Sequence, residues 1–308
     1  MGIYAVIDMG TNSLKMHVAE VADGRTTVLG DFTEVTRLGE GLHETGRLAP
    51  EALVRNAEAV CAFARRAREM GAEEIVAVGT MALRTAANAD DFVALVRERC
   101  GLDVEIIPGE EEARLAYLAV LSGLGTAEGT VCVFDTGGGS TEFIFGRGEE
   151  IVERFSLDVG SRRPTEQFCK SDPVTPEELQ ELLAYLDGEL SRLHGPVDVL
   201  VGMGGTVTSL GAVHHMMEVY DPDVIQGSRL TRAEVERQLE MYRSLTVAER
   251  REVVGLMPKR ADVILAGAAI VLTVMRRLGA DSLVISDRGL RHGLFYDRFV
   301  RGRRTSCA

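Results

Sequence analysis

The feature that most constrains this chain is a short pattern that occurs twice. Residues 5–18 read AVIDMGTNSLKMHV, and residues 132–145 read CVFDTGGGSTEFIF. Both copies hold Asp-x-Gly-x-x-Ser between two apolar runs, and matching residues are a constant 127 positions apart, as Asp8 and Asp135 are. Each copy is therefore predicted to form a strand, a tight glycine turn and a second strand.

A turn of this composition is suited to binding phosphate, because glycine and hydroxyl residues bare backbone N–H groups that can cradle an anion. Two such turns in two similar halves indicate a clamp around a chain of phosphates. A carboxylate, Asp8 or Asp135, ends the first strand of each copy. Beside a phosphate that arrangement is costly unless a cation lies between the charges. Mg²⁺ binds few carboxylates and keeps phosphate oxygens and water as further ligands, so we assign both residues to a metal region.

The remaining pattern predicts a duplicated α/β chain. Strands expected at 3–8, 14–21 and 26–36 are followed by alternating helices and strands, and the pattern restarts at 130. This order predicts a mixed sheet with flanking helices in each half. A linker of small residues places the domain boundary between 1–124 and 125–308. The longest apolar stretch, at 263–275, is too short to span a bilayer. The predicted helix that contains it, at 260–278, suits either the core or association into a homodimer.

Composition limits the classes of function. The net charge of −13 and the pI near 5.0 argue against general nucleic-acid binding. A phosphate-rich ligand would then need a local cation, and the candidate basic residues are Arg84, Arg162, Arg163, Lys259, Arg260, Arg288 and Arg291. The five cysteines are odd in number and lack CxxC spacing, so reduced thiols in a cytoplasmic protein are expected. The histidines show no metal-binding spacing.

Several acidic residues are candidates for the chemistry. Glu142 directly follows the second turn, a position that favours contact with metal or water. Glu110, Glu111 and Glu112 begin a predicted helix, and hydrolysis of a phosphoanhydride needs a carboxylate to orient or deprotonate water. The helical wheel does not choose between Glu111 and Glu112. A third glycine turn, at 202–208, opens a helix and favours anions.

Taken together, these motifs resemble the exopolyphosphatase/guanosine pentaphosphate phosphatase (Ppx/GppA) family, of the actin, Hsp70 and sugar-kinase superfamily. The matching segments run from Tyr4 to about Asp297. They are DMGTNS at 8–13, GTMALR at 79–84, GEEEAR at 109–114, DTGGGSTE at 135–142, GGT at 204–206 and SDRGLR at 286–291. The resemblance implies two duplicated actin-like (RNase H-like) domains with the active site in the cleft between them.

The resemblance also implies roles for residues. Glu112 would be the catalytic base, Arg84 would bind the terminal phosphate, and Asp135 and Glu142 would hold the divalent metal and the attacking water. The implied phosphate-binding residues are Thr11, Asn12, Ser13, Gly137, Gly138, Gly139, Ser140 and Thr141, with Gly204, Gly205 and Thr206 at a nucleotide or a distal phosphate. Asp158 and Pro164 depart from the family pattern and leave a phosphate contact by Arg163 undecided.

The expected activity is Mg²⁺-dependent, or Mn²⁺-dependent, hydrolysis of the terminal phosphoanhydride of polyphosphate. The alternative is removal of the 5′ terminal phosphate of guanosine pentaphosphate. Two further alternative functions are a kinase of the same superfamily and a non-catalytic sensor that binds nucleotide or polyphosphate. Longer relatives append a helical HD-type domain, so this chain is expected to be the short, two-domain form and to handle short chains or nucleotides better than long polymers. Neither a nucleic acid nor a membrane is an expected partner.

Overall fold

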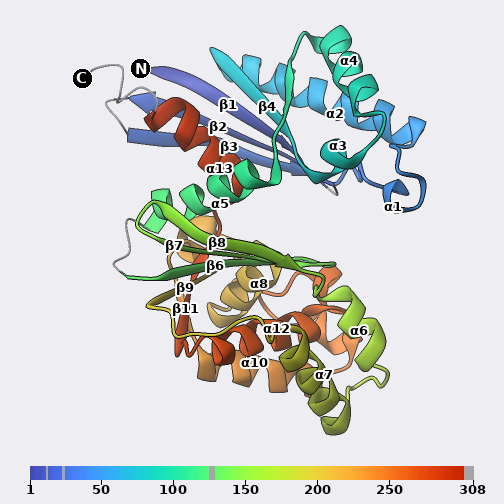
Figure 1. Cartoon of the computed structure of the whole chain (residues 1–308), viewed down its shortest axis with the longest axis vertical. Coiled ribbons are helices and arrows are strands. Elements are labelled where there is room, and N and C mark those ends of the chain that lie inside the picture. Colours follow the sequence, from blue (N-terminus) through green and yellow to red (C-terminus); the bar gives the residue numbers. More distant parts are fainter. Residues whose placement is uncertain (12, 23–24, 125–128, 302–308) are drawn as a thin grey trace. The chain divides into compact units, whose positions relative to one another are not determined.

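The computed structural model describes residues 1–11, 13–22, 25–124 and 129–301, and the chain divides into two compact units (Figure 1). Among the described residues, the first unit holds Met1–Ala119 together with the segment from Leu290 to Arg301, and the second holds Val120–Gly289. No helix within the described ranges combines the length and the apolar character needed to cross a membrane.

In its described part, the first unit contains a five-stranded mixed sheet with the order β3-β2-β1-β4-β5. The strands are β1 (Gly2–Met9), β2 (Leu14–Ala22), β3 (Arg25–Glu34), β4 (Glu74–Gly79) and β5 (Val104–Ile106). β1 pairs antiparallel with β2, and β2 pairs antiparallel with β3. On the other side of β1, β4 pairs parallel with β1 and β5 pairs parallel with β4.

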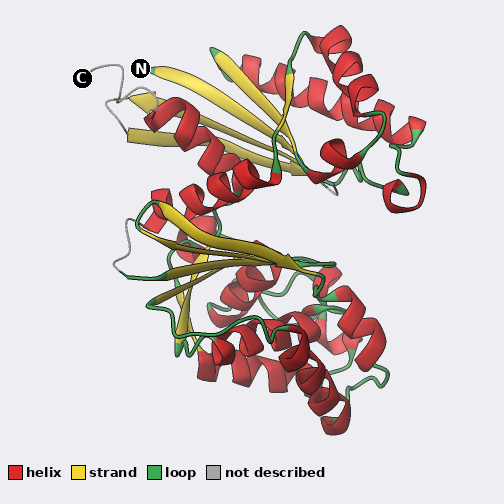
Figure 2. Cartoon of the chain, viewed as in Figure 1, coloured by secondary structure: helices red, strands yellow, loops and turns green. Residues whose placement is uncertain are grey.

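Helices cover both faces of this sheet (Figure 2). They are α1 (Leu42–Thr45), α2 (Pro50–Glu69), α3 (Met81–Thr85), α4 (Ala89–Cys100), α5 (Gly109–Leu124), α13 (Leu290–Phe295) and the π-helix η2 (Tyr296–Arg301). The residues of α5 from Val120 onward belong to the second unit. Alternate residues of β1 serve the two faces, because successive side chains of a strand point to opposite sides. Ala5 and Ile7 pack in the cluster that includes α2 and α4, whereas Tyr4 and Val6 pack with α5, α13 and η2.

The C-terminal helices α13 and η2 pack with the first unit. The predicted division into 1–124 and 125–308 assigns them to the second. Phe299 of η2 stacks on Tyr4 of β1 with 4.6 Å between ring centroids. Arg114 of α5 also forms an ion pair with Asp297 of η2, at 2.8 Å. These contacts cover the Tyr4 and Val6 face of the first sheet, which the residues up to 124 would not cover by themselves.

In its described residues, the second unit contains a six-stranded sheet with the order β10-β11-β9-β6-β7-β8. The strands are β6 (Val131–Thr136), β7 (Thr141–Arg147), β8 (Glu150–Leu157), β9 (Val199–Met203), β10 (Arg229–Thr231) and β11 (Ser282–Ser286). β6, β7 and β8 pair antiparallel, β9 and β11 continue in parallel, and β10 pairs antiparallel with β11 at the edge.

The helices of the second unit build one large core around α12. They are α6 (Arg162–Phe168), α7 (Pro176–Glu189), α8 (Gly204–His214), α9 (Pro222–Ile225), α10 (Arg232–Ser244), α11 (Val247–Arg250), the 3₁₀ helix η1 (Pro258–Arg260) and α12 (Ile264–Arg277). Every residue of α12 from Ile264 to Met275 is buried. The apolar helix expected at 260–278 therefore lies in the core, as one of its two interpretations predicted.

The predicted duplication is present in three dimensions, down to single hydrogen bonds. Gly10 N–H donates to Ser13 O at 3.0 Å, and Gly137 N–H donates to Ser140 O at 2.9 Å. Each second strand carries a register shift against the third strand, between Val18 and Ala19 in β2 and between Phe145 and Gly146 in β7. These shifts are again 127 positions apart, so the two halves share their backbone irregularities as well as their topology.

Candidate functional site

The glycine loop of the second unit is held from behind and bare in front. Gly160 lies so close that a Cβ on it would meet the backbone of Gly138 and Gly139 at 2.4 Å. Arg162 N–H donates to Gly138 O at 3.0 Å. By contrast, a Cβ on Gly138 or Gly139 would meet nothing within 4 Å, and neither residue has a φ that only glycine tolerates. Packing and conformation do not require these two glycines, so the open backbone is available to a ligand.

Two carboxylates lie beside this loop. Asp135 at the end of β6 is the register partner of Glu142 in β7, and directly opposed residues project to the same face of an antiparallel pair. The hydroxyls of Ser140 and Ser156 donate to Glu142 Oε1 at 2.6 and 3.0 Å. Like charges placed opposite each other are unfavourable. A hard divalent cation such as Mg²⁺, which prefers oxygen ligands, would relieve the repulsion between the carboxylates of Asp135 and Glu142.

The third glycine turn lies directly behind Asp135. A Cβ on Gly204 would lie 1.9 Å from Asp135 Oδ1, and the φ of Gly204 is +83°, so both space and conformation require glycine here. A Cβ on Gly205 would collide with the guanidinium of Arg260. Burial lowers the pKa of Arg260, and the negative charge of Asp135 opposes that shift. The turn thus brings a cation and the first helical N–H groups of α8 close to Asp135.

The glycine loop of the first unit has a different partner for its carboxylate. Asp8 at the end of β1 is the register partner of Lys15 in β2, and these residues correspond to Asp135 and Glu142. Asp8 is 7% exposed. Burial raises the pKa of Asp8 to about 6, although the positive charges of Lys15 and Arg291 act against the shift. The first loop therefore already contains a cation from the protein.

The structure distinguishes the glutamates at the start of α5. Glu112 Oε2 accepts a hydrogen bond from Arg84 Nη1 at 2.9 Å, and the same Arg84 nitrogen donates to Ile107 O at 2.9 Å. Glu111 instead accepts from Arg114 through both oxygens, at 2.8 Å each. The negative charge of Glu112 also acts on Asp8. Glu112 thus joins the predicted catalytic arginine and the first loop, whereas Glu111 helps to fasten Arg114.

Other predicted residues lie elsewhere or act differently. The Thr141 hydroxyl is buried and donates to Val159 O at 2.5 Å, and Thr206 is buried against Gly267 of α12. These two hydroxyls, predicted to face phosphate or nucleotide, are turned into the fold, and the backbone N–H groups of both residues stay candidates. Asn12 lies outside the described residues. Arg162 and Arg163 are exposed.

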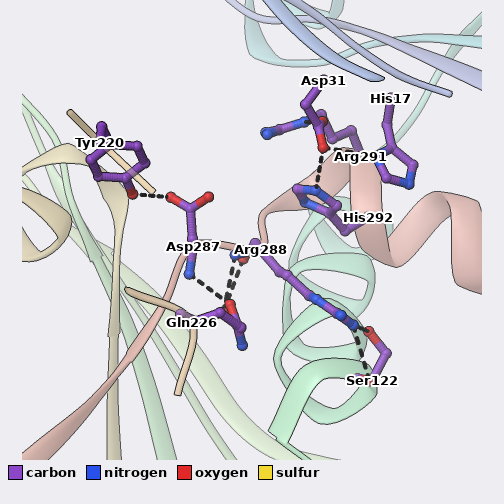
Figure 3. A network of polar contacts seen from close by, with 10 residues as sticks. His17, Asp31, Ser122, Tyr220, Gln226, Asp287, Arg288, Arg291 and His292 are labelled. Atoms are coloured by element: carbon purple, nitrogen blue, oxygen red, sulfur yellow. Dashed lines mark hydrogen bonds and ion pairs between the residues drawn. The ribbon is translucent and has the colours of Figure 1, made fainter. Parts of the chain in front are cut away.

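Two further basic candidates are engaged within the structure. Arg288 Nη1 donates to Ser122 O at 3.0 Å, and Arg291 Nε donates to Asp31 Oδ1 at 2.8 Å (Figure 3). Each contact lies within a single unit. These partners explain how the side chains are held without assigning them to a ligand.

Sequence reasoning missed two groups of residues. Lys15 could have been found by extending the 127-position offset to Glu142, which shows that the two copies differ in charge at this position. The second group is His17, Asp31 and His292, which come from three separate parts of the chain and lie together in the first unit (Figure 3). No local spacing signals the second group.

The sequence of the chain is similar to those of known proteins over most of its length. The model of the Ppx/GppA phosphatase family matches residues 17–301. The chain is 34% identical over 314 residues to exopolyphosphatase 2 of Mycobacterium tuberculosis, covering 94% of this chain and 96% of that one. It is 32% identical over 309 residues to a guanosine-5′-triphosphate,3′-diphosphate pyrophosphatase of Photobacterium profundum, covering 98% of this chain and 60% of that one.

The chain is also similar in fold to a solved structure. The Ppx/GppA phosphatase of Aquifex aeolicus superposes with a TM-score of 0.91 at 36% sequence identity, covering 97% of this chain and 100% of that one. The predicted fold class, two related mixed α/β domains of the actin-like type, is confirmed. Because the family model spans most of its length and these relatives match nearly all of it, the chain belongs to the Ppx/GppA phosphatase family.

Proposed function

We propose that this protein hydrolyses the terminal phosphoanhydride bond of inorganic polyphosphate and releases orthophosphate. The observation that carries the proposal is the pair of opposed carboxylates, Asp135 and Glu142, beside a glycine loop whose front is bare. Such a site suits a phosphate chain neutralised by a divalent cation. The similarity to an exopolyphosphatase over nearly the whole of both chains supports this choice of substrate.

Asp135 and Glu142 are the residues that would hold Mg²⁺, with Mn²⁺ as a substitute, and Asp8 is assigned to the same region. When bound, the ion would supply positive charge to the phosphoryl oxygens. The backbone N–H groups of the glycine loops would bind phosphate oxygens. Lys15 and Arg260 add positive charge from the protein, one in each unit.

Glu112 would orient the attacking water in line with the terminal bond. As the water oxygen bonds to phosphorus, its proton passes to the carboxylate, the bridging P–O bond breaks, and the shortened chain leaves with the bridging oxygen. Arg84, which holds Glu112 at 2.9 Å, would bind the terminal phosphate.

The second candidate is removal of the 5′ terminal phosphate of guanosine pentaphosphate. It is favoured by the 32% identity to the Photobacterium profundum pyrophosphatase, although this chain covers only 60% of that relative. The exopolyphosphatase relative is covered to 96%, which is why polyphosphate is placed first. A superfamily kinase would instead transfer the phosphoryl group to a hydroxyl or carboxylate acceptor.

We also propose a cytoplasmic location, because Cys61, Cys100, Cys132 and Cys169 are free thiols in the described part of the chain, and reduced thiols are typical of that compartment. The association into a homodimer stays a prediction. Size-exclusion chromatography with light scattering would determine the oligomeric state.

The test is phosphate release with Mg²⁺ from short-chain polyphosphate and from guanosine pentaphosphate, measured side by side. Glu112→Gln should lower kcat about 10³-fold on the preferred substrate, because loss of a general base removes roughly that factor. Glu110→Gln is the matched control, since it makes the same change at an exposed residue of the same helical turn. It should retain wild-type activity.

The outcomes separate the candidates. The substrate that is turned over faster identifies the branch of the family. Full activity of Glu112→Gln would show that Glu112 does not activate the attacking water. If neither substrate releases phosphate, ADP formation from ATP in the presence of candidate acceptors would favour the kinase, and binding of polyphosphate without turnover would favour a sensor.

A further inference from the structure

Three potential metal ligands from three elements meet in the first unit, and none of them belongs to a glycine loop. His17 lies on β2, Asp31 on β3 and His292 on α13 (Figure 3). Their ligand atoms all lie within 4.8 Å of one another. The imidazole rings of His17 and His292 also pack edge to face, with 4.7 Å between centroids. One oxygen of Asp31 faces both rings.

The two separations that involve Asp31 Oδ2 are compatible with a shared metal ion. Asp31 Oδ2 lies 3.1 Å from His17 Nδ1 and 3.5 Å from His292 Nε2. The second distance is longer than an ordinary N–H···O hydrogen bond. Tetrahedral coordination with bonds of about 2.0–2.1 Å places its donor atoms about 3.3 Å apart. The two observed distances lie on either side of that value.

The other oxygen of Asp31 has its own partner. Arg291 Nε donates to Asp31 Oδ1 at 2.8 Å, and the Arg291 side chain is 14% exposed. This bond fixes the carboxylate and leaves Oδ2 directed at the two imidazoles. Hydrogen bonds that orient a ligating group in this way are a regular part of protein metal sites. Arg291 therefore completes the cluster without competing for the oxygen that faces the histidines.

The surroundings suit an ion with an open coordination position. The His292 side chain is 13% exposed, and its Nε2 lies 3.5 Å from Asp31 Oδ2. His17 is buried and packs edge to face on Phe295, with 4.9 Å between centroids. Asp31 is 34% exposed, which gives an ion and a fourth ligand, such as water, access from solvent.

We propose that His17, Asp31 and His292 form a binding site for a divalent transition metal ion of the Zn²⁺ type. Two imidazole nitrogens and one carboxylate oxygen are ligands that zinc accepts, whereas Mg²⁺ prefers oxygen donors throughout. The site is therefore distinct in chemistry from the Asp135 and Glu142 pair. A bound ion fastens α13 to β2 and β3, and so stabilises the C-terminal segment on the first sheet.

The test is a titration of the chelator-treated protein, residues 1–308, with Zn²⁺ by calorimetry, and with Co²⁺ by visible absorption. The expected result is one high-affinity equivalent of Zn²⁺ that excess Mg²⁺ does not displace, and absorption bands typical of four-coordinate Co²⁺. His292→Ala and Asp31→Asn should each weaken Zn²⁺ binding at least 10-fold. His215→Ala is the control, because His215 is an exposed histidine of the second unit.

A thermal unfolding measurement covers variants that fold poorly. Zn²⁺ should raise the Tm of the wild type and of His215→Ala, since a ligand that binds only the folded state stabilises it. It should not raise the Tm of His292→Ala or Asp31→Asn. The proposal is overturned if the wild type binds no Zn²⁺ equivalent, or if the two site variants bind it as the wild type does. These readouts do not depend on phosphate release, so they stand apart from the proposed activity.

Discussion

The two glycine loops share a backbone but differ in charge. In both, the glycine N–H donates to the serine carbonyl of the turn, at 3.0 Å in the first loop and 2.9 Å in the second. In both, a segment after the third strand supports the loop, with Gly39 N–H donating to Thr11 O at 2.9 Å and Arg162 N–H donating to Gly138 O at 3.0 Å. Thr11 and Gly138 are again 127 positions apart.

The difference lies opposite the carboxylate. Asp8 is opposed by Lys15, whereas Asp135 is opposed by Glu142. The first pair is close to neutral and leaves Asp8 buried, with a pKa near 6. The second pair concentrates negative charge beside the bare glycines and favours binding of an external cation. A duplicated turn can thus keep its geometry while the charge opposite its carboxylate is reversed, from a lysine in the first copy to a glutamate in the second.

The largest expected effect comes from giving the second loop the charge of the first. Glu142→Lys would reproduce the Asp8 and Lys15 pairing, so metal-dependent phosphate release should fall about 10³-fold, because a metal supplies several kcal/mol of charge stabilisation. The measurement is phosphate release as a function of Mg²⁺ concentration. Glu181→Lys, the same charge change on the exposed surface of α7, should have little effect. Unchanged Mg²⁺ dependence of Glu142→Lys would end the assignment of the metal to this pair.

A smaller effect tests the buried carboxylate of the first loop. The pKa of Asp8 is raised from 3.8 to about 6, so the folded state holds a proton that the unfolded state has released between these values. Stability from this group is therefore present below pH 4 and is lost as the pH rises to 6, by about 3 kcal/mol in all.

Asp8→Asn carries a neutral side chain at every pH and should lack this loss. The measurement is chemical unfolding of both proteins from pH 4 to 7, with a chelator present to remove metal. The difference in unfolding free energy between wild type and variant should change across pH 4–6, the wild type becoming relatively less stable. A constant difference would show that Asp8 titrates normally.

The smallest predicted effects distinguish a glycine that supports the second loop from a glycine that leaves room for a ligand. Gly160→Ala should lower the unfolding free energy by about 2 kcal/mol, because its Cβ would meet the loop backbone at 2.4 Å. Gly139→Ala should leave stability within about 0.5 kcal/mol, since its Cβ would meet nothing within 4 Å. If phosphate approaches this backbone, Gly139→Ala should still raise KM. A stable Gly139→Ala with an unchanged KM would show that the bare face is not used.

Part of the candidate site could be predicted from the sequence because it is written in local patterns. The offset of 127 positions is enough to identify both glycine loops and both terminal carboxylates. The choice between Glu111 and Glu112 could not be made on the helical wheel, because it depends on where two arginine side chains lie. The resemblance to the family assigned the role to Glu112, and the structure adds that Glu111 is paired with Arg114 of its own helix whereas Glu112 is paired with Arg84 of a different helix.

The duplication, the mixed α/β class and the turns that bare backbone N–H groups all follow from the sequence, because strand alternation, helical periodicity and glycine turns are properties of neighbouring residues. The return of α13 and η2 to the first unit, and the burial of Thr141 and Thr206, became clear only in three dimensions. The same is true of the cluster of His17, Asp31 and His292. These outcomes depend on which distant surfaces pack together. The periodicity of one segment does not indicate which other segment it packs against.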